Sequence, residues 1–508
     1  MKTKPILPTL FAATASVLFA PLVARGDVTL PEIFSDGMVL QRNAAIPLWG
    51  TADAGETVSV VLGAQKQTTV AGVDGRWMVK MAPMPAGGPL EVTVSGKNTL
   101  KLQNVVLGEV WLASGQSNME LRLPRVTNAD QEIAAANYPL IRMFRVGRSI
   151  ADTPQSAARG AWVAASPQTA DQFTAVGYFF ARELQKKLGV PIGLIHASYG
   201  GTPAQAWTSR AAMQSNPDLQ GIFAQWEKTL ADYPQAKQKY DEQMVRWKER
   251  AALAKAEGKP EPAALIAPPG PGGKATPAGL YNGMIAPLIP YAIKGVIWYQ
   301  GESNTREPEL YRKLFPALVT DWRRAWGIGD FPFLWVQLAN FHKPQSAPAE
   351  EGWASLREAQ TMTLALPNTG QAVSIDIGEA GDIHYRNKQD AGKRLALVAL
   401  ATQYGEKIEY SGPSYEGAEI EKGRIRLKFT HAAGLMAQGG GELKGFAIAG
   451  KDGVFVWAQA RIDGADVVVS SPQVPDPVAA RYNWADNPIG NFYNAVGLPA
   501  SSFRTDVK

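Results

Sequence analysis

Cysteine is absent from the 508 residues of the chain, and only four histidines are present. The absence of cysteine excludes disulfides, Cys₂His₂ zinc sites, iron–sulfur clusters and lipid-anchored cysteines. The net charge is +5. Three of the positive charges, Lys2, Lys4 and Arg25, lie in the first 26 residues, where no acidic residue offsets them, so +2 remains for the rest. A nearly neutral chain gives no electrostatic reason to expect binding to nucleic acid or anionic lipid.

Long hydrophobic runs are missing beyond the N-terminus, where no segment reaches the ~18 apolar residues of a membrane span. At the N-terminus, Lys2 and Lys4 precede the apolar residues 6–23, and Ala24 and Gly26 are small residues suited to cleavage. This pattern favours a signal peptide over residues 1–26 rather than a retained membrane anchor. We therefore expect a soluble protein, exported to the periplasm or secreted.

The length predicts about three domains, because single cores rarely serve more than ~200 residues. Residues 27–104 contain alternating or apolar runs such as 57–62 and 90–94, separated by Gly, Pro and Asp, and predict a β-sandwich-like domain. Residues 405–508 are similar, with alternation at 424–429, and predict a second β-rich domain.

The middle of the chain, residues 105–404, alternates short apolar runs with helical stretches. This order predicts a parallel sheet covered by helices on both faces, an α/β fold. Polar loops follow the strands, and such sheets bind ligands at the carboxyl ends of their strands. The predicted strands are 105–112, 191–195, 295–299, 333–336 and 372–376, and the predicted helices are 173–188, 311–326 and 386–404.

Residues 209–279 interrupt the alternation. Residues 222–256 are charged, rich in alanine and helical in character, and a Pro/Gly-rich loop follows them. We expect an inserted helical hairpin. Two interpretations of this insertion remain open. It is either a lid or domain brace, or a surface excursion without a role.

Two serines follow predicted strands and are candidate nucleophiles. Ser117 stands at a strand-to-helix turn, where backbone N–H groups are free, and Ser198 lies one residue from a nucleophile-elbow pattern. His384 is the candidate base at the same sheet edge, with Asp382 close in sequence to orient it. His196 lies at the end of an apolar run, where a buried structural role is expected.

Three blocks of the chain resemble the sialate O-acetylesterases, a family of the SGNH-hydrolase superfamily. Residues 111–119 are similar to the nucleophile block, residues 295–304, with the run Trp-Tyr-Gln-Gly-Glu-Ser-Asn, to the second hallmark, and residues 382–396 to the histidine block. Residues 38–41 and 484–488 extend the likeness into both β-rich flanks. The resemblance implies an SGNH-hydrolase-like parallel sheet flanked by helices, with β-rich N- and C-terminal domains.

The resemblance also implies hydrolysis of sugar acetates without metal or organic cofactor. Ser117 is then the nucleophile and His384 the base, and Ser198 becomes structural. The oxyanion is expected to bind the Ser117 N–H, a backbone N–H of Gly200 or Gly201, and the Gln300 side chain, in place of the Asn of other SGNH enzymes.

The carboxylate that orients His384 is left open. SGNH enzymes usually place an Asp three residues before the histidine, a position that Gly381 occupies here. Asp382 is our first choice and Glu302 the competitor, and a backbone carbonyl is the third possibility.

Aromatic side chains near the site predict a sugar-binding surface. We expect Tyr199 and Trp207 to contact the sugar, together with Asn118 and Asn304 of the two hallmark blocks. Trp298 and Trp335 lie within predicted strands and are expected in the core.

Acetylated sialic acid and acetylated plant polysaccharides such as xylan or xyloglucan are both open as substrates. Arg122, Arg125 and Arg306 lie close in sequence to the site blocks and are candidates for binding a carboxylate. Two other functions are possible from the sequence. One is a glycoside hydrolase that uses Glu302 and Asp382 as a carboxylate pair, and the other is a non-catalytic polysaccharide-binding protein. The oligomeric state is not predicted.

Overall fold

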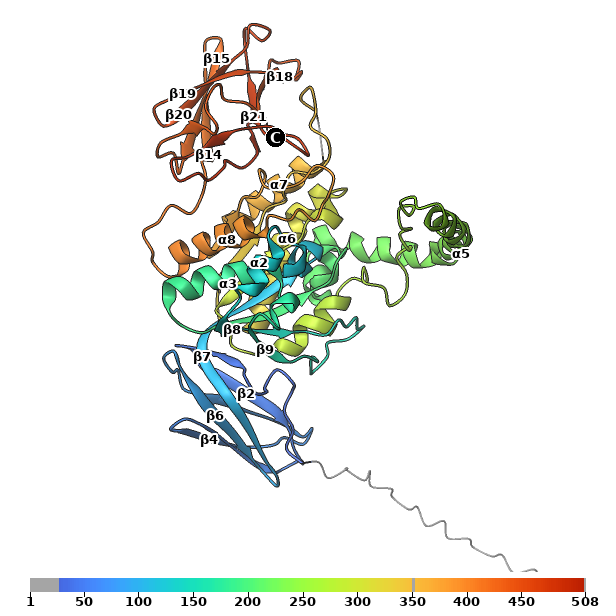
Figure 1. Ribbon diagram of the computed structural model, residues 1–508, viewed down its shortest axis with the longest axis vertical. Helices are drawn as coiled ribbons and strands as arrows, with labels where there is room; N and C mark the ends of the chain where they lie inside the picture. Colours follow the sequence, from blue (N-terminus) through green and yellow to red (C-terminus); the bar gives the residue numbers. More distant parts are fainter. Residues whose placement is uncertain (1–26, 350–351, 507–508) are drawn as a thin grey trace, which may run out of the picture.

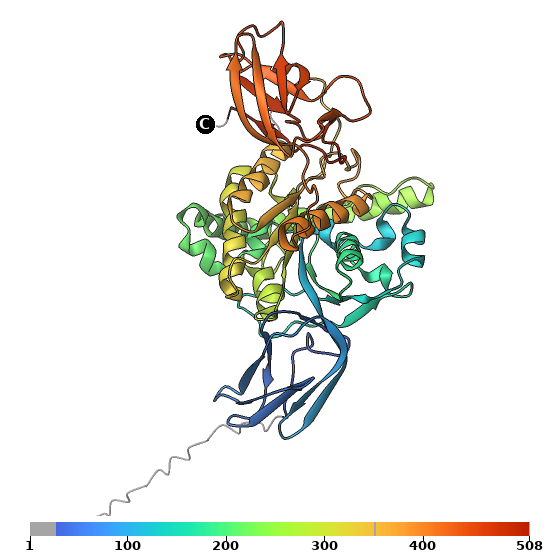
Figure 2. The same ribbon diagram turned by 90° about the vertical axis from the view of Figure 1, so that its left-hand side faces the viewer.

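A computed structural model of the chain describes residues 27–349 and 352–506. The predicted signal peptide, residues 1–26, lies outside the described residues. The chain forms three stacked parts along its long axis: a β-rich N-terminal part, a central α/β part, and a β-rich C-terminal part (Figures 1 and 2). No helix in the described ranges is both long and apolar enough to cross a membrane.

The N-terminal part is built from strands with one buried face. In β3 the side chains of Val58, Val60 and Leu62 are buried and their neighbours are more exposed, as expected for a strand with one face in a core. Strand β7 (Thr99–Gly115) pairs with β6 in this part and continues into the central sheet, so it runs through the predicted boundary between residues 104 and 105. The other strands are β1 (Val39–Gln41), β2 (Ile46–Thr51), β3 (Thr57–Leu62), β4 (Gln65–Val70), β5 (Arg76–Met81) and β6 (Gly87–Ser95).

The central sheet has the strand order β13-β12-β11-β7-β10-β8-β9 and is parallel except for β9. This confirms the predicted α/β fold. Two strands, β8 and β9, were not predicted, and the predicted strand 372–376 shares only Ala372 with the observed β13, because residues 369–372 are the ones that pair with β12. The strands are β8 (Tyr138–Arg145), β9 (Trp162–Ala165), β10 (Ile192–Ser198), β11 (Gly295–Tyr299), β12 (Phe333–Val336) and β13 (Thr369–Ala372).

Helices cover both faces of the central sheet. On one face the ring of Trp111 packs against Phe180 of α3, and on the other Trp298 packs against Trp322 of α6. Helix α8 lies beside α3, and α7 lies beside α6. The helices are α1 (Ser117–Glu120), α2 (Ala129–Ala134), α3 (Ala175–Leu188), α4 (Arg210–Ser215), α5 (Gly221–Ala256), α6 (Pro308–Trp326), α7 (Gly352–Met362) and α8 (Lys388–Gln403).

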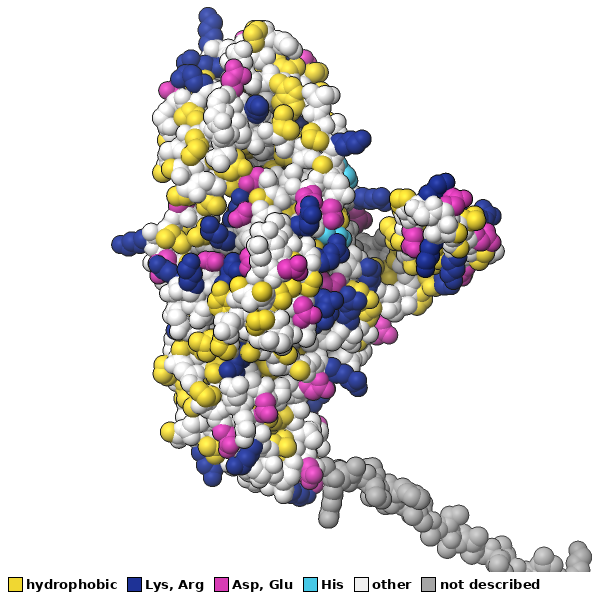
Figure 3. All heavy atoms as spheres, viewed as in Figure 1, with side chains coloured by type: hydrophobic (Ala, Val, Ile, Leu, Met, Phe, Trp, Pro, Cys, Tyr) yellow, Lys and Arg dark blue, Asp and Glu magenta, His cyan; other side chains and the backbone are white. Residues whose placement is uncertain are grey.

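The insertion at 209–279 differs from the predicted hairpin. It contains one long helix, α5, which projects from the central part, and the chain returns through residues 257–280 without a second long helix (Figure 1). Prolines and glycines in the returning segment prevent a second helix. The returning segment packs against α5. Trp247 of α5, for example, donates from Nε1 to the carbonyl of Ala263 in the returning segment at 2.8 Å. Charged and hydrophobic side chains alternate on the surface of this projection in Figure 3.

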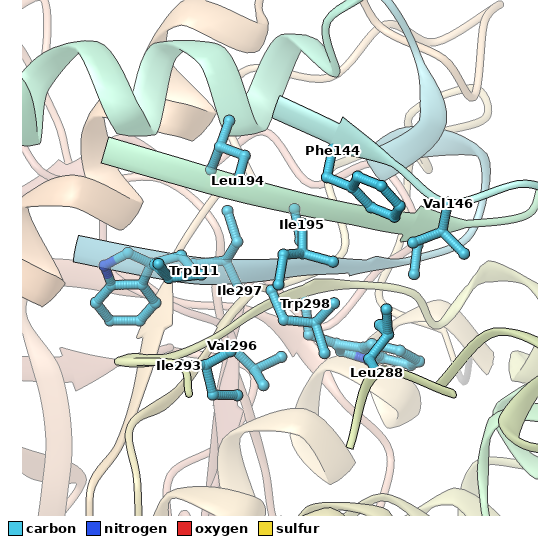
Figure 4. Close-up of a cluster of buried hydrophobic side chains, with 14 of the residues drawn as sticks. Trp111, Phe144, Val146, Leu194, Ile195, Leu288, Ile293, Val296, Ile297 and Trp298 are labelled. Atoms are coloured by element: carbon cyan, nitrogen blue, oxygen red, sulfur yellow. The ribbon is translucent and has the colours of Figure 1, made fainter. Parts of the chain in front are cut away.

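The main core lies between the central sheet and its helices. Figure 4 shows the side chains of Trp111, Ile195, Ile297 and Trp298 gathered from three neighbouring strands. Trp298 and Trp335 are fully buried, as predicted for core residues.

The C-terminal part has a hydrophobic core of its own between two four-stranded antiparallel sheets. The sheets have the orders β14-β15-β20-β19 and β18-β17-β21-β23, and β16 pairs with β22. The strands are β14 (Ser414–Glu421), β15 (Arg424–Thr430), β16 (Met436–Ala437), β17 (Phe446–Ala449), β18 (Val456–Trp457), β19 (Gln459–Asp463), β20 (Asp466–Ser470), β21 (Ala479–Tyr482), β22 (Phe492–Tyr493) and β23 (Phe503–Arg504).

Candidate active site

Three adjacent strands bring the predicted site loops together. Strands β11, β7 and β10 are neighbours, and Gly115 at the end of β7 pairs with Tyr299 on one side and Ser198 on the other. Gly115 has φ +133, and a Cβ there would lie 2.1 Å from the Tyr299 carbonyl oxygen. Only glycine fits this close approach of two strands, which turns the chain toward Ser117.

Ser117 is the first residue of the short helix α1 and is half-buried. Its N–H and its hydroxyl make no hydrogen bond to any residue in the described ranges. Ser117 and His384 both line a cavity of about 540 Å³. The structure thus brings the two predicted catalytic residues to one cavity.

His384 lies in the loop between β13 and α8. The helix begins at Lys388, two residues later than predicted, because the Asn387 side chain caps it by accepting from the Asp390 N–H at 3.1 Å. Burial lowers the pKa of His384. The positive charges of Lys388 and Arg125 add to this, and the carboxylate of Asp382 opposes it. A lowered pKa leaves the imidazole neutral near pH 7, as a general base requires.

Asp382 contacts His384 directly, through both its imidazole and its backbone. The Oδ1 atom of Asp382 is 3.7 Å from His384 Nδ1, and it accepts the His384 backbone N–H at 2.8 Å. The loop turns back on itself through a bridge between Glu379 and Asp382, which makes this spacing of two residues workable. Glu302 is engaged elsewhere: its Oε1 accepts from the Asn118 side chain at 2.5 Å, and burial raises its pKa.

Gly200 is held from both sides. Its N–H donates to Glu120 Oε2 at 2.9 Å, and its carbonyl accepts from Lys274 Nζ at 2.7 Å. Glu120 is also bound by Arg148. The N–H of Gly201 makes no hydrogen bond within the described ranges. Of the two predicted glycine donors, Gly201 is therefore the free one in this conformation.

Gln300 does not fit its predicted role. Its side chain is fully buried, and Nε2 already donates to the Thr202 carbonyl at 3.2 Å and to Asn304 Oδ1 at 2.7 Å. Its Oε1 accepts from the Tyr311 hydroxyl at 3.1 Å. In this conformation both hydrogens are donated inside the protein, so the amide has no free hydrogen for an oxyanion.

Three of the four side chains predicted to contact the sugar are buried in this conformation. Asn118, Asn304 and Trp207 are buried, and their polar atoms bond within the protein. Trp207, for example, donates from Nε1 to the Thr202 hydroxyl at 2.9 Å. Tyr199 is half-buried, and the guanidinium of Arg148 lies 4.4 Å from the centre of its ring. None of the three buried side chains lines the cavity that holds Ser117 and His384.

Ser198 forms a second serine–histidine pair inside strand β10. Its Oγ lies 2.5 Å from His196 Nε2, and both residues are buried. Burial lowers the pKa of His196 to about 3. The pair lies within the sheet, away from the cavity lining, in agreement with the structural roles expected for both residues.

Arginines dominate the cavity. Arg122 and Arg125 line it as the sequence suggested, whereas Arg306 does not. Arg145 and Arg148 also line it and were missed because Arg145 ends β8, a strand that was not predicted, and Arg148 follows that strand. Figure 3 shows dark blue and magenta side chains gathered on the middle of the molecule, on the side from which α5 projects.

The arginines repel one another. Burial and the charges of Arg122 and Arg148 lower the pKa of Arg145, and Glu120 opposes this. Within the described ranges, Arg148 pairs with Glu120, while Arg122, Arg125 and Arg145 make no ion pair. Three unpaired guanidinium groups around one cavity favour an anionic ligand.

In residues 27–349 and 352–506, no group of three or more His, Cys, Asp or Glu side chains is placed to hold a metal ion.

Comparison with known proteins identifies the family. A family model described as carbohydrate esterase, sialic acid-specific acetylesterase matches residues 107–257 and 275–401. The chain is 33% identical over 444 residues to a sialate O-acetylesterase of Rattus norvegicus, covering 79% of this chain and 78% of the rat protein. It is 32% identical over 456 residues to a sialate O-acetylesterase of Homo sapiens, covering 81% and 79%.

A solved structure agrees with these matches. The crystal structure of a carbohydrate acetylesterase from Xanthomonas citri is 39% identical and superposes with a TM-score of 0.80, covering 95% of this chain and 100% of that chain. These findings confirm the resemblance seen in the sequence blocks. The chain belongs to the sialic acid-specific acetylesterase family of carbohydrate esterases and is a carboxylic ester hydrolase.

Proposed function

We propose that the protein removes acetyl groups from sugars by a serine–histidine acyl-enzyme mechanism. The observation that carries this proposal is the presence of Ser117 and a histidine of lowered pKa, His384, on one cavity. His384 takes the Ser117 hydroxyl proton as Oγ attacks the acetyl carbonyl carbon. The tetrahedral intermediate collapses, the sugar oxygen leaves with the proton from His384, and acetyl-Ser117 remains. Water, deprotonated by His384, then releases acetate and restores the serine.

The oxyanion of the intermediate is bound by backbone donors. We assign the Ser117 N–H at the start of α1 and the Gly201 N–H, which are both unbonded in the described structure. The N–H of Gly200 joins them only when the Glu120 carboxylate moves away. A single such donor is worth roughly 10²–10³ in turnover.

Asp382 orients the imidazole. Its carboxylate lies 3.7 Å from Nδ1, so a small closure brings it within hydrogen-bond distance. We favour Asp382 over Glu302 for this role because an oxygen of Glu302 already accepts from the Asn118 side chain.

The substrate is an O-acetylated sugar that carries a carboxylate. Arg122, Arg125 and Arg145 make no ion pair in the described ranges and, with Arg148, outnumber the carboxylates of Glu120 and Asp171 in the cavity lining, which supports this choice. An acidic sugar, such as a sialic acid, suits this charge better than a neutral xylan or xyloglucan chain, which offers no anion to them. Arg–carboxylate pairing also fixes the orientation of the bound sugar.

Acetate release from matched substrates tests this choice. Acetylated sialosides should be cleaved with a higher kcat/KM than acetylated xylo-oligosaccharides or xyloglucan oligosaccharides. Arg145→Met should raise KM for the acidic substrates and leave KM for the neutral ones unchanged, and Arg306→Met is the control outside the cavity. Equal kcat/KM for both substrate classes, with no effect of Arg145→Met, would show that the arginines do not select the substrate.

The protein is exported to the periplasm or secreted. This proposal rests on residues 1–26, whose basic start and apolar stretch are typical of a signal peptide. N-terminal sequencing of the protein isolated from its native compartment should give a start near Asp27. A cytoplasmic protein that retains Met1 would contradict export.

A further inference from the structure

We propose that Asn118 is a positioning residue whose side chain holds the His384 loop against the Ser117 turn, and that the buried pair Lys388 and Glu302 fixes the direction of its amide. This inference rests on the proposed function, because it assumes that Ser117 and His384 act together.

The two catalytic residues begin far apart in the sheet. Ser117 follows β7, whereas the His384 loop leaves β13, three strands away at the sheet edge. Strands are spaced by ~4.8 Å, so the loop must cross roughly 14 Å to reach the serine. A loop of this length has many conformations, and some contact must hold it at the serine.

The Asn118 side chain makes that contact. Asn118 directly follows Ser117, and its Nδ2 donates to the carbonyl of Ile383 at 3.0 Å. Ile383 directly precedes His384. One short side chain therefore connects the residue after the nucleophile to the residue before the base, at a site that is 1% exposed.

Charges on either side fix the direction of the amide. The second hydrogen of Nδ2 goes to Glu302 Oε1 at 2.5 Å, and Oδ1 accepts from Lys388 Nζ at 2.7 Å. A flipped amide would place NH₂ against the ammonium and the oxygen against the carboxylate. The hydrogen bonds to Glu302 and Lys388 therefore favour the observed direction of the amide, in which one hydrogen faces Ile383.

The side chain of Lys388 lies in a buried site between two aromatic rings and Asn118. It is fully buried, with its Nζ 3.2 Å from the centre of the Tyr385 ring and 5.6 Å from that of Tyr299. Burial holds the pKa of Lys388 well below its usual range, and the charge of Glu302 opposes this. The Asn118 oxygen and the two aromatic faces contact Nζ directly. Lys388 does not line the cavity that holds Ser117 and His384, so its contact with Asn118 supports a positioning role.

Loss of the contact should slow the reaction without weakening binding. A catalytic group displaced by about 1 Å can cost roughly 10²-fold in rate. Asn118 does not line the cavity that holds Ser117 and His384, so KM should stay nearly constant while kcat falls.

An exchange of two side chains separates positioning from stability. Asn118→Asp removes the donor to Ile383 and places a second carboxylate against Glu302. In the double variant Asn118→Asp/Glu302→Gln, the Gln amide donates to the Asp and the Asp still accepts from Lys388, so the charges and internal bonds are restored. No donor then faces Ile383. We expect the melting temperature to return toward wild type, while kcat stays about 10²-fold low with KM nearly unchanged.

Two controls complete the experiment. Asn494 is equally buried, and its Nδ2 also makes two donations, in this case to the carbonyls of Ser411 and His431. Asn494→Asp should lower stability and leave kcat intact. Asn118→Ala, in which Lys388 and Glu302 have room to pair directly, gives the same kcat and KM comparison without a new charge and serves where the Asp variants do not fold.

The outcomes are distinct. Wild-type kcat in the double variant or in Asn118→Ala overturns the positioning role. Wild-type activity in Ser117→Ala overturns the proposed function itself. An inactive Ser117→Ala together with a fully active double variant overturns only the inference about Asn118.

Discussion

At the residue scale, the environment of each side chain decides what it does. The cavity holds one serine with a free hydroxyl, Ser117, whereas Ser198 is bonded to His196 inside a strand. The two carboxylates that the sequence left open also differ: Asp382 faces His384, and Glu302 is bound to Asn118.

Ser117→Ala should abolish esterase activity, because the acyl-enzyme cannot form. Losing such a serine can cost roughly 10⁶ in turnover. The melting temperature should change little, since the hydroxyl has no partner in the described structure. Ser198→Ala is the matched control: it should lower the melting temperature by breaking the buried contact with His196, yet retain kcat. The reverse pattern for the two serines would make Ser198 the nucleophile.

Turnover should fall in acid with a midpoint below ~6.5, the usual imidazole pKa. Protonated His384 cannot accept the serine proton, and its pKa is lowered by burial, so the loss is displaced toward lower pH. The pH profile of kcat/KM with an aryl acetate measures the midpoint. Arg125→Met should raise it, because a neighbouring positive charge is removed. A wild-type midpoint above 7 would contradict a lowered pKa.

Asp382→Asn should reduce kcat by roughly 10²–10⁴, because the imidazole loses the carboxylate that orients it. Glu302→Gln should cost no more than about tenfold, since the Gln carbonyl still accepts from Asn118. Parallel kcat measurements on the two variants decide between them. A greater loss in Glu302→Gln would assign the orienting role to Glu302.

At the element scale, ends of strands and returns of loops place the site. Gly115 ends β7 where only a glycine fits between neighbouring strands. The segment that returns from α5 reaches the same edge, and Lys274 binds the Gly200 carbonyl there. The insertion therefore contacts the loop of Gly200 and Gly201 directly.

Lys274→Met should lower kcat by roughly tenfold, the value of one hydrogen bond to a charged group. Without the ammonium, the peptide between Gly200 and Gly201 is less firmly oriented and its N–H less polarised. Lys259→Met is the control, because Lys259 lies in the same returning segment but pairs with Glu257. An unchanged kcat in Lys274→Met would leave the insertion without a role in turnover.

At the scale of the whole molecule, both β-rich parts are bonded to the central part by motifs of the family resemblance. Gln41 accepts the Val110 N–H at 2.8 Å and so attaches residues 38–41 to β7. Arg357 of α7 is fully buried, and it donates to the carbonyls of Ala485 and Asp486, both at 2.7 Å. These contacts explain why the likeness extends beyond the site blocks.

Arg357→Met should destabilise the joint between the central and C-terminal parts. Several buried carbonyls lose their donor, at roughly 1–3 kcal/mol for each group left unpaired. Thermal unfolding should shift to lower temperature, and limited proteolysis should separate the C-terminal part more readily. Arg76→Met, at an exposed arginine, is the control. A melting temperature equal to that of wild type would rule out Arg357 as the joint.

The sequence by itself determined the α/β class, the main strands and the family. Apolar runs such as 295–299 and 333–336 can be read locally, because a strand buried on both faces needs apolar side chains at every position. The sequence blocks around Ser117 and His384 could be recognised as well. Each combines a candidate catalytic side chain with nearby glycines at the carboxyl-terminal edge of the sheet, and this combination of residues can be read from the sequence.

Only the tertiary structure decided what the polar residues beside those blocks do. Gln300, Asn304 and Asn118 were assigned to oxyanion or substrate, yet all three are buried and bonded to one another or to the backbone. Arg145 was missed although it lines the cavity. Neither local pattern nor spacing records which way a polar side chain points, because burial and partners come from segments distant in the chain.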